Sequence, residues 1–277
     1  MRALAPAEVA EAFRAACLAE LSALKPGNVH VFAAGHGMET AQFEAAAAAA
    51  APAVADPALR VGARVLAAVE ASLAVAGCNT NLGIILLCAP LAVAAEGGGP
   101  LRDHLTVVLD GLDLSDAAAT FRAIATASPG GLGAAAEADV RAPASITLKD
   151  AMALAADRDA IARQYVTGYA DLFALGVPTL AGEPLERRRI EDAYIAFLAT
   201  LPDSHIARKF GPEQAEAVRM EAAALRDRLT GLSPADRHDA LLAYDASLKA
   251  RGLNPGTSAD LTVASIFAAL MAAWAEA

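Results

Sequence analysis

The segment Leu82–Ala95 constrains the fold more than any other part of the chain, because it would be apolar on every face of a helix. Such a helix has to be covered on all sides by other elements. Elsewhere apolar residues recur at helical spacing, and the interruptions resemble helix ends rather than interdomain linkers. We therefore predict an all-α fold in which residues 1–277 form a single compact domain. It would have about nine or more helices around a buried central helix, Leu82–Ala95.

Glycine, proline and short polar residues mark the expected helix ends. One helix is predicted at about 7–24, another from about residue 38, a third ending at Gly77, and the last at about 259–274. Residues 105–112 also fit a short β-hairpin with a turn at Asp110-Gly111, although a helix is the main prediction. The other predicted boundary residues are Thr147, Gly176, Pro178, Pro212, Ser233, Pro234 and Gly252.

Charge and hydropathy argue against several classes of protein. The chain has 22 Lys and Arg against 32 Asp and Glu, a net charge of −10 that disfavours general binding to nucleic acid or to an anionic membrane. No uninterrupted apolar span reaches about 18 residues, and Glu8, Glu11 and Arg14 interrupt any signal-peptide core. We therefore expect a cytoplasmic protein. The cysteines show no metal-ligand spacing and are interpreted as buried reduced thiols: Cys17, Cys78 and Cys88.

Glu20 and the segment after it form the first polar cluster that chemistry could use. Glu20 leans toward the apolar stripe of the first predicted helix, so its carboxylate needs a partner. The helix then breaks at Lys25-Pro26-Gly27-Asn28-Val29-His30, which supplies an ammonium, backbone amides and an imidazole. The structural alternative is that Glu20 simply pairs with a nearby Lys or Arg.

The second and third clusters precede two predicted helices. Asn79-Thr80-Asn81 followed by Gly83 opens the central helix, and Asn254-Pro255-Gly256 with Ser258 and Asp260 opens the last one. Helix N-termini attract phosphate and carboxylate groups, and a carboxylate such as Asp260 could bind a divalent ion that bridges phosphates. The alternative is that these residues only cap the helices and favour their dipoles.

A fourth cluster places Arg208 and Lys209 after Asp203 in an otherwise acidic chain, and a solvated turn is its alternative. Two weaker candidates complete the set. Glu137 and Asp139 could place carboxylates near a metal or could face solvent. His36, just before the second helix, could present an imidazole to a ligand.

In their order and separation these segments resemble triphosphoribosyl-dephospho-CoA synthase. The resemblance rests on Lys25-Pro26-Gly27, a Gly-His-Gly-Met stretch at 35–38, Asn79-Thr80 with Gly83, and Asn254-Pro255-Gly256 followed by Ser258-Ala259-Asp260. It implies an all-α, ATP-using transferase. In that reaction the 2′-hydroxyl of dephospho-CoA attacks the ribose C1″ of ATP and adenine leaves, which yields a precursor of an acyl-carrier-protein prosthetic group.

The resemblance and the clusters together give a set of candidate site residues. Glu20, His30 and His36 are the candidate catalytic residues. The Glu20 carboxylate could stabilise an oxocarbenium-like centre or act as a base on the incoming hydroxyl. Mg²⁺ is the expected cofactor, with Asp260, Glu137 and Asp139 as candidate ligands. The candidate nucleotide-binding and phosphate-binding residues are Lys25, Pro26, Gly27, Asn28, Asn79, Thr80, Asn81, Gly83, Arg208, Lys209, Asn254, Gly256 and Ser258.

The chain also departs from the family pattern. Asn81 and Leu82 stand where the family has His and Lys, Gly37 replaces an acidic residue, and Thr257 replaces a glycine. Further departures occur at Asn28, at His30 and across 137–140. These changes suggest that the nucleotide site persists while the acceptor has changed, and they leave open whether the bond broken in ATP has changed as well.

Two alternatives to the synthase-like function stay open. One is an ATP-dependent kinase or other nucleotide-dependent transferase that makes a one-carbon carrier cofactor of the methanopterin or methanofuran type. The other is a non-catalytic helical nucleotide-binding protein. The expected partners are small-molecule substrates, ATP and a nucleotide-like or cofactor-precursor acceptor, with no nucleic acid or membrane. Alanine-rich helix surfaces could also support a homodimer.

Overall fold

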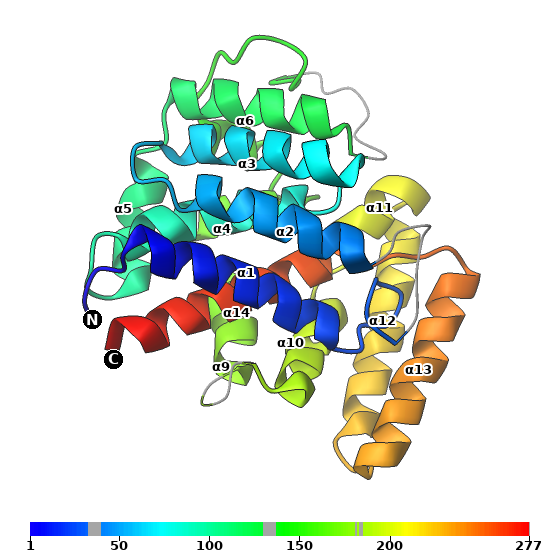
Figure 1. Cartoon of the computed structure of the whole chain (residues 1–277). Helices are drawn as coiled ribbons and strands as arrows, with labels where there is room; N and C mark the ends of the chain where they lie inside the picture. The colour runs from blue at the N-terminus through cyan, green and yellow to red at the C-terminus, as the bar shows by residue number, and fades with distance from the viewer. Residues whose placement is uncertain (33–39, 130–136, 181, 183–184, 277) are drawn as a thin grey trace.

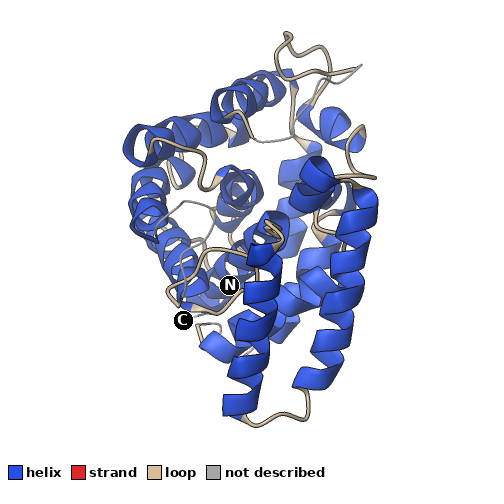
Figure 2. Cartoon of the chain, turned by 90° about the vertical axis from the view of Figure 1, so that its right-hand side faces the viewer, coloured by secondary structure: helices blue, strands red, loops and turns tan. Residues whose placement is uncertain are grey.

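The computed structural model describes residues 1–32, 40–129, 137–180, 182 and 185–276. Within these residues the chain is helical and has no strand, which confirms the all-α prediction (Figure 2). The elements are α1 (Pro6–Ser22), α2 (Thr40–Val54), α3 (Val61–Ala76), α4 (Leu82–Ala95), α5 (Leu101–Asp110), α6 (Leu114–Ala127), α7 (Leu148–Ala153), α8 (Ala160–Thr167), the π-helix η1 (Leu172–Gly176), α9 (Val177–Thr179), α10 (Arg187–Thr200), α11 (Ser204–Phe210), α12 (Pro212–Leu229), α13 (Pro234–Ala250) and α14 (Gly256–Glu276).

The predicted central helix is α4, with the bounds that the sequence indicated. Helices α14, α1, α2, α3 and α6 lie side by side, each packed on the next (Figure 1). Helix α4 packs against α2, α3 and α14 of this row and against α5 and α8. Twelve of its 14 residues are buried, because neighbours cover it on every side.

Two tyrosine hydroxyls donate hydrogen bonds to backbone carbonyls of α4 near a proline inside the helix. Pro90 lies inside the helix and has no N–H to donate to the carbonyl of Leu86. The hydroxyl of Tyr165 donates to that carbonyl at 2.6 Å, and the hydroxyl of Tyr169 donates to the carbonyl of Leu87 at 3.0 Å. Both tyrosines are fully buried, so these hydrogen bonds satisfy backbone oxygens that water cannot reach.

A second apolar cluster joins α10, α11, α12 and α13. Helices α12 and α13 form an antiparallel pair that extends away from the row of helices around α4 (Figures 1 and 2). The structure confirms that Pro212 and Pro234 lie in the first turns of these helices and that Ser233 caps α13. The extent of residues 1–277 as a single domain stays a prediction.

Three details of the predicted boundaries are wrong. Residues 105–110 belong to α5, so the hairpin alternative does not form. The sequence predicts that Gly176 and Pro178 end the pair of helices after Thr147, but helical structure continues through both residues. Gly176 lies in η1, where an added Cβ would fall 2.0 Å from the Ser265 hydroxyl, and Pro178 is tolerated because it occupies the first turn of α9. Ser258 does not cap α14, which already begins at Gly256.

Helix α14 is the one helix, among the residues described, that is long and apolar enough to cross a membrane. Its most apolar window has 72% of its residues buried inside the structure, a property it shares with core helices of globular proteins. The cysteines are all free thiols, with Cys17 and Cys88 buried and Cys78 half-buried.

Candidate active site at the N-termini of four helices

The N-termini of α4, α8, α11 and α14 converge. Asp203, at the start of α11, accepts hydrogen bonds from the backbone N–H of Ser258 in α14, at 2.8 Å, and from its hydroxyl, at 2.9 Å. The next residue, Ser204, accepts a hydrogen bond from the N–H of Ala160 at the start of α8, at 2.8 Å. A Cβ added to Gly83 in α4 would fall 2.9 Å from Ile161 of α8. The starts of four helices therefore meet in one region, and Asp203 and Ser204 accept hydrogen bonds that link three of them.

Asp260 lies directly against the start of α4. A Cβ at Gly83 would be 2.0 Å from Oδ2 of Asp260, so only glycine allows this approach. Although part of its surface is exposed, burial raises the pKa of Asp260 well above its ordinary value, and the nearby carboxylates of Asp203, Glu20 and Asp159 raise it further. The Arg208 guanidinium opposes this rise. Carboxyl groups are therefore concentrated around Asp260, and their mutual repulsion favours protonation of Asp260.

Unsatisfied polar atoms occur just before α4 and on α11. Among the described residues, Thr80 Oγ1, Asn81 Nδ2 and Arg208 Nε are buried atoms without a hydrogen-bond partner in the protein. Asn81 is only 5% exposed, whereas the neighbouring Asn79 is used as a cap and accepts from the N–H of Leu82 at 3.2 Å. An orphaned buried donor costs free energy, so a bound acceptor at this place would be favourable.

Glu20 and Lys25 form a buried ion pair beneath this region. The Lys25 ammonium is 0% exposed and donates to Glu20, to the side chain of Asn28 at 3.2 Å and to the carbonyl of Val29 at 2.8 Å. These contacts use all three of its N–H groups. Burial raises the pKa of Glu20 and lowers the pKa of Lys25, so both groups are held closer to neutrality than in water.

The two glycine-containing loops pack against each other. Gly27 adopts a φ of +81°, and a Cβ there would lie within 2.9 Å of three atoms, those of Pro255, Leu248 and Leu253. The Asn28 amide donates to the side chain of Asn254 at 2.8 Å. The N–H of Gly27 donates to Asp245 at 2.8 Å. Gly27 therefore stabilises the loop through its backbone N–H and through the close packing that the absence of a side chain allows.

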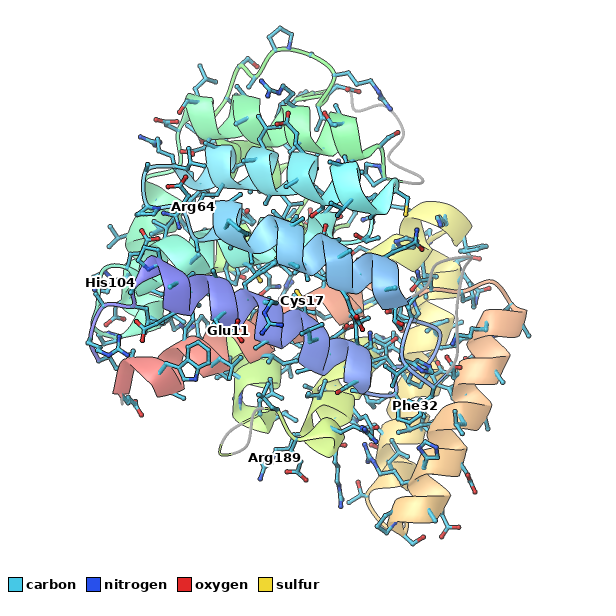
Figure 3. All side chains as sticks on the ribbon, viewed as in Figure 1. Glu11, Cys17, Phe32, Arg64, His104 and Arg189 are labelled. Carbon is cyan, nitrogen blue, oxygen red and sulfur yellow. The ribbon has the colours of Figure 1, made fainter. Side chains whose placement is uncertain are left out.

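His30 belongs to a buried network behind the first loop. Its Nε2 lies 3.3 Å from Asp245, which also pairs with Lys249 at 3.0 Å, and its Nδ1 accepts from the N–H of Phe32 at 3.2 Å. Burial lowers the pKa of His30, which favours the neutral imidazole. Phe32, labelled in Figure 3, lies under the guanidinium of Arg187.

Comparison with known proteins identifies the family. Residues 6–277 match the family CitG, ATP:dephospho-CoA triphosphoribosyl transferase. The chain belongs to this family. A crystal structure from Archaeoglobus fulgidus, provisionally described as triphosphoribosyl-dephospho-CoA synthase, is similar, with a TM-score of 0.68 and 26% identity over 83% of this chain and 99% of that chain. No curated protein matches significantly. The protein is thus a transferase of the triphosphoribosyl-dephospho-CoA synthase type.

The other candidate residues of this CitG family member differ in their exposure and in their hydrogen-bond partners. The carbonyl of Pro26 accepts from Tyr194 at 2.7 Å, and Gly256 lies next to His205. Lys209 is exposed, as is Glu137. Asp139 accepts from the N–H of Arg141 at 2.9 Å, and His36 lies outside the residues that the structure describes.

Sequence reasoning missed Asp159 and Asp245, and it named Asp203 in the fourth cluster without giving it a role in the site. Asp159 caps α8 and pairs with Arg208 at 2.7 Å, Asp203 caps α11, and Asp245 holds the loop at Gly27. A signal existed for the first two, because each immediately precedes a helix. Their second partners come from distant parts of the chain, which spacing alone does not reveal.

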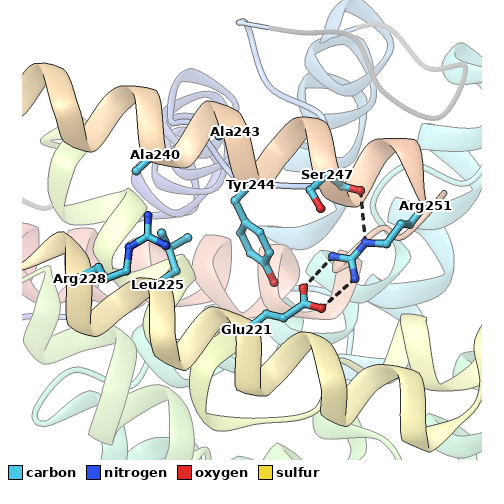
Figure 4. Close-up of a pocket in the computed structure, with 8 residues that line it drawn as sticks. All are labelled: Glu221, Leu225, Arg228, Ala240, Ala243, Tyr244, Ser247 and Arg251. Atoms are coloured by element: carbon cyan, nitrogen blue, oxygen red, sulfur yellow. Dashed lines mark hydrogen bonds and ion pairs between the residues drawn. The ribbon is translucent and has the colours of Figure 1, made fainter.

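A groove in this family member lies on other elements than the converging helix N-termini. It has a volume of about 450 Å³ and lies between α12 and α13, where the ion pair of Glu221 and Arg251 crosses it (Figure 4). Tyr244 and Arg228 line it together with small side chains of α13. None of the residues that line it is among the candidates from the sequence, so we keep the helix N-termini as the candidate site.

Proposed function

We propose that this chain binds ATP with Mg²⁺ at the N-terminus of α4 and transfers the triphosphoribosyl group to dephospho-CoA. The observation that carries this proposal is that two buried donors, Asn81 Nδ2 and Arg208 Nε, have no hydrogen-bond partner in the protein. Asn81 is two residues before Gly83, which contacts Asp260, and Arg208 is close enough to affect the pKa of Asp260. Phosphate oxygens are the acceptors that such donors prefer.

The donor set fits a divalent cation that phosphates help to bind. The carboxyl groups of Glu20, Asp159 and Asp203 all lie close enough to Asp260 to raise its pKa, and the Arg208 guanidinium lies close enough to lower it. The Lys25 ammonium is close to both Glu20 and Asp260. The described residues contain no group of three or more acidic, His or Cys side chains arranged to hold a metal by themselves. Mg²⁺ is commonly held by one or two carboxylates plus substrate phosphates. Asp260 would hold the ion, which supplies positive charge against the triphosphate.

Glu20 is the carboxylate that we assign to the acceptor hydroxyl. As a base it would take the hydroxyl proton while the hydroxyl oxygen bonds to the ribose C1″ of ATP and the bond from C1″ to adenine breaks. The electron pair of that bond leaves with the adenine nitrogen, and the proton held by Glu20 is then returned to adenine. A carboxylate with a raised pKa is a stronger base than one in water, which suits this step. Its negative charge would also stabilise positive charge at C1″.

Lys25 then has a different role from the phosphate contact expected from the sequence. All of its N–H groups are occupied inside the protein, and its side chain is fully buried. We assign it to holding the Glu20 carboxylate in place and to tuning its basicity.

The direct test is product analysis with the purified protein, ATP, Mg²⁺ and dephospho-CoA. Release of adenine together with triphosphoribosyl-dephospho-CoA is the expected result. Release of ADP or AMP would instead indicate the kinase or other transferase, and an absence of nucleotide binding would indicate a helical protein without this activity. A parallel reaction with EDTA should lose turnover, because the Mg²⁺ at Asp260 would be removed.

The role of Glu20 is tested by Glu20→Gln, which keeps the shape of the side chain. We expect kcat to fall by at least about 100-fold with little change in ATP affinity, because general-base assistance contributes about 10² to 10⁴. Glu11→Gln is the matched control, since Glu11 lies on the same helix in an exposed pair with Arg14. Unchanged turnover in Glu20→Gln would remove this residue from the mechanism.

The setting of the reaction follows from its substrates. We expect the protein to act in the cytoplasm, where ATP is available. The alanine-rich outer faces of its helices suit a homodimer, which size-exclusion chromatography with light scattering would detect.

A further inference from the structure

Asp203 makes contacts that exceed the needs of a helix cap. It is 2% exposed, and its Oδ1 accepts from the N–H groups of His205 and Ile206, at 2.9 and 3.1 Å, which completes the cap of α11. Serine, threonine or asparagine would suffice for that cap. The second oxygen, Oδ2, accepts two further hydrogen bonds from Ser258 at the start of α14. One carboxylate therefore fixes the N-termini of two helices to each other.

These two helices carry the opposite charges of the candidate site. Arg208 is in the last turn of α11, and Asp260 is on α14, two residues after Ser258. Arg208 is also held by Asp159, whose carboxylate caps α8. A shift of α11 relative to α14 would separate Arg208 from Asp260 and move both relative to the N-terminus of α4.

A buried carboxylate at this point has an electrostatic cost. It lies close enough to Asp260 for the two negative charges to repel. An asparagine would avoid that repulsion, but its NH₂ group would then face the two donors of Ser258, or its orientation would sacrifice the cap of α11. Only a group with two acceptor oxygens satisfies both helices.

We propose that Asp203 is a positioning residue for the transfer reaction, one that sets the distance between Arg208 and Asp260 across the bound triphosphate. This assignment rests on the proposed binding of Mg·ATP at these helix N-termini. Asp203 itself does not contact the substrate. Its effect reaches the substrate through the hydrogen bonds to Ser258 and to the first turn of α11.

The structure offers a matched control. Asp116 is also 2% exposed and also links the starts of two helices, because it accepts from the N–H of Gly62 in α3, at 2.9 Å, and from the N–H of Asp113 before α6, at 3.2 Å. It makes no contact with the candidate site in the interactions of the described chain. Asp116→Asn therefore reports the cost of losing a buried carboxylate link without affecting the site.

The experiment compares full-length wild type, Asp203→Asn and Asp116→Asn. Mg·ATP binding is measured by calorimetry, kcat and KM by adenine release, and Tm by thermal unfolding. We expect both variants to lose stability. Asp203→Asn alone should weaken Mg·ATP binding and raise the KM for ATP by about tenfold, the effect of one lost charged hydrogen bond. Equal Mg·ATP affinity in the two variants would overturn the proposal.

Ser258→Ala keeps the test decisive if Asp203→Asn does not fold. It removes one of the two donors to Asp203 Oδ2 and leaves the backbone donor in place. A severalfold rise in the KM for ATP with a small change in Tm is expected, and an unchanged KM would refute the positioning role. Failure of the wild type to bind Mg·ATP would count against the proposed function instead, so the two failures can be distinguished.

Discussion

Gly83→Ala tests the site geometry with the smallest possible change. The added Cβ would fall 2.0 Å from Asp260 Oδ2 and 2.5 Å from its Cγ, whereas ordinary contact begins at 3.4 Å. The Asp260 carboxylate or the start of α4 must therefore move by about 1.4 Å, the difference between these two distances. Overpacking of this kind costs about 1–3 kcal/mol, while alanine gains up to about 1 kcal/mol over glycine within a helix. The net loss of stability should be small.

The effect on transfer should be much larger than the effect on stability. A misplacement of about 1 Å can cost about 100-fold in rate, equivalent to about 2.7 kcal/mol of transition-state stabilisation. We expect kcat/KM for adenine release to fall by about that factor. Gly231→Ala is the control, because nothing lies within 4 Å of a Cβ there. The reasoning is refuted if Gly83→Ala keeps kcat/KM within threefold of the control, since the carboxylate would then not need its present position.

Three further variants have definite expected outcomes. Tyr165→Phe removes the hydrogen bond to the Leu86 carbonyl and should lower the free energy of unfolding by about 1–3 kcal/mol in urea, with turnover unchanged; a stability equal to wild type would contradict it. Lys25→Ala leaves the Glu20 carboxyl buried without its cation, so a loss of about 3 kcal/mol in the same assay is expected together with loss of turnover, and wild-type turnover would exclude the role given to the pair. The pKa of Asp260 is raised by folding, so its stabilising contribution is complete below the ordinary Asp pKa and is lost as pH rises through the raised value. Asp260→Asn should therefore raise the Tm of the ligand-free protein at pH 8, and the rise should become smaller as the pH is lowered toward 4. An equal rise in Tm at pH 8 and at pH 4 would show that folding does not raise the pKa of the Asp260 carboxyl.

The sequence determined the class of fold and the family. The run Leu82–Ala95 is apolar on all sides, and only a helix with neighbours on every face can bury it. The order of the motifs around Lys25, Asn79 and Asn254 indicated the same family that residues 6–277 match. Periodicity and motif order are properties of the chain itself, so they can be read without coordinates. The burial of Glu20 and its need for a cationic partner also followed from the position of Glu20 on the helical stripe.

Only the tertiary structure decided how the candidate residues are used. Lys25 proved fully buried and occupied by three acceptors, and Ser258 proved to be a partner of Asp203 rather than the cap of its own helix. Asp203 and Ser258 are 55 residues apart, and their hydrogen bonds depend on how α11 meets α14. Spacing along a chain fixes which residues share a helix face, because helix geometry is local. It does not fix which helix ends meet, since that depends on how all the apolar faces pack together.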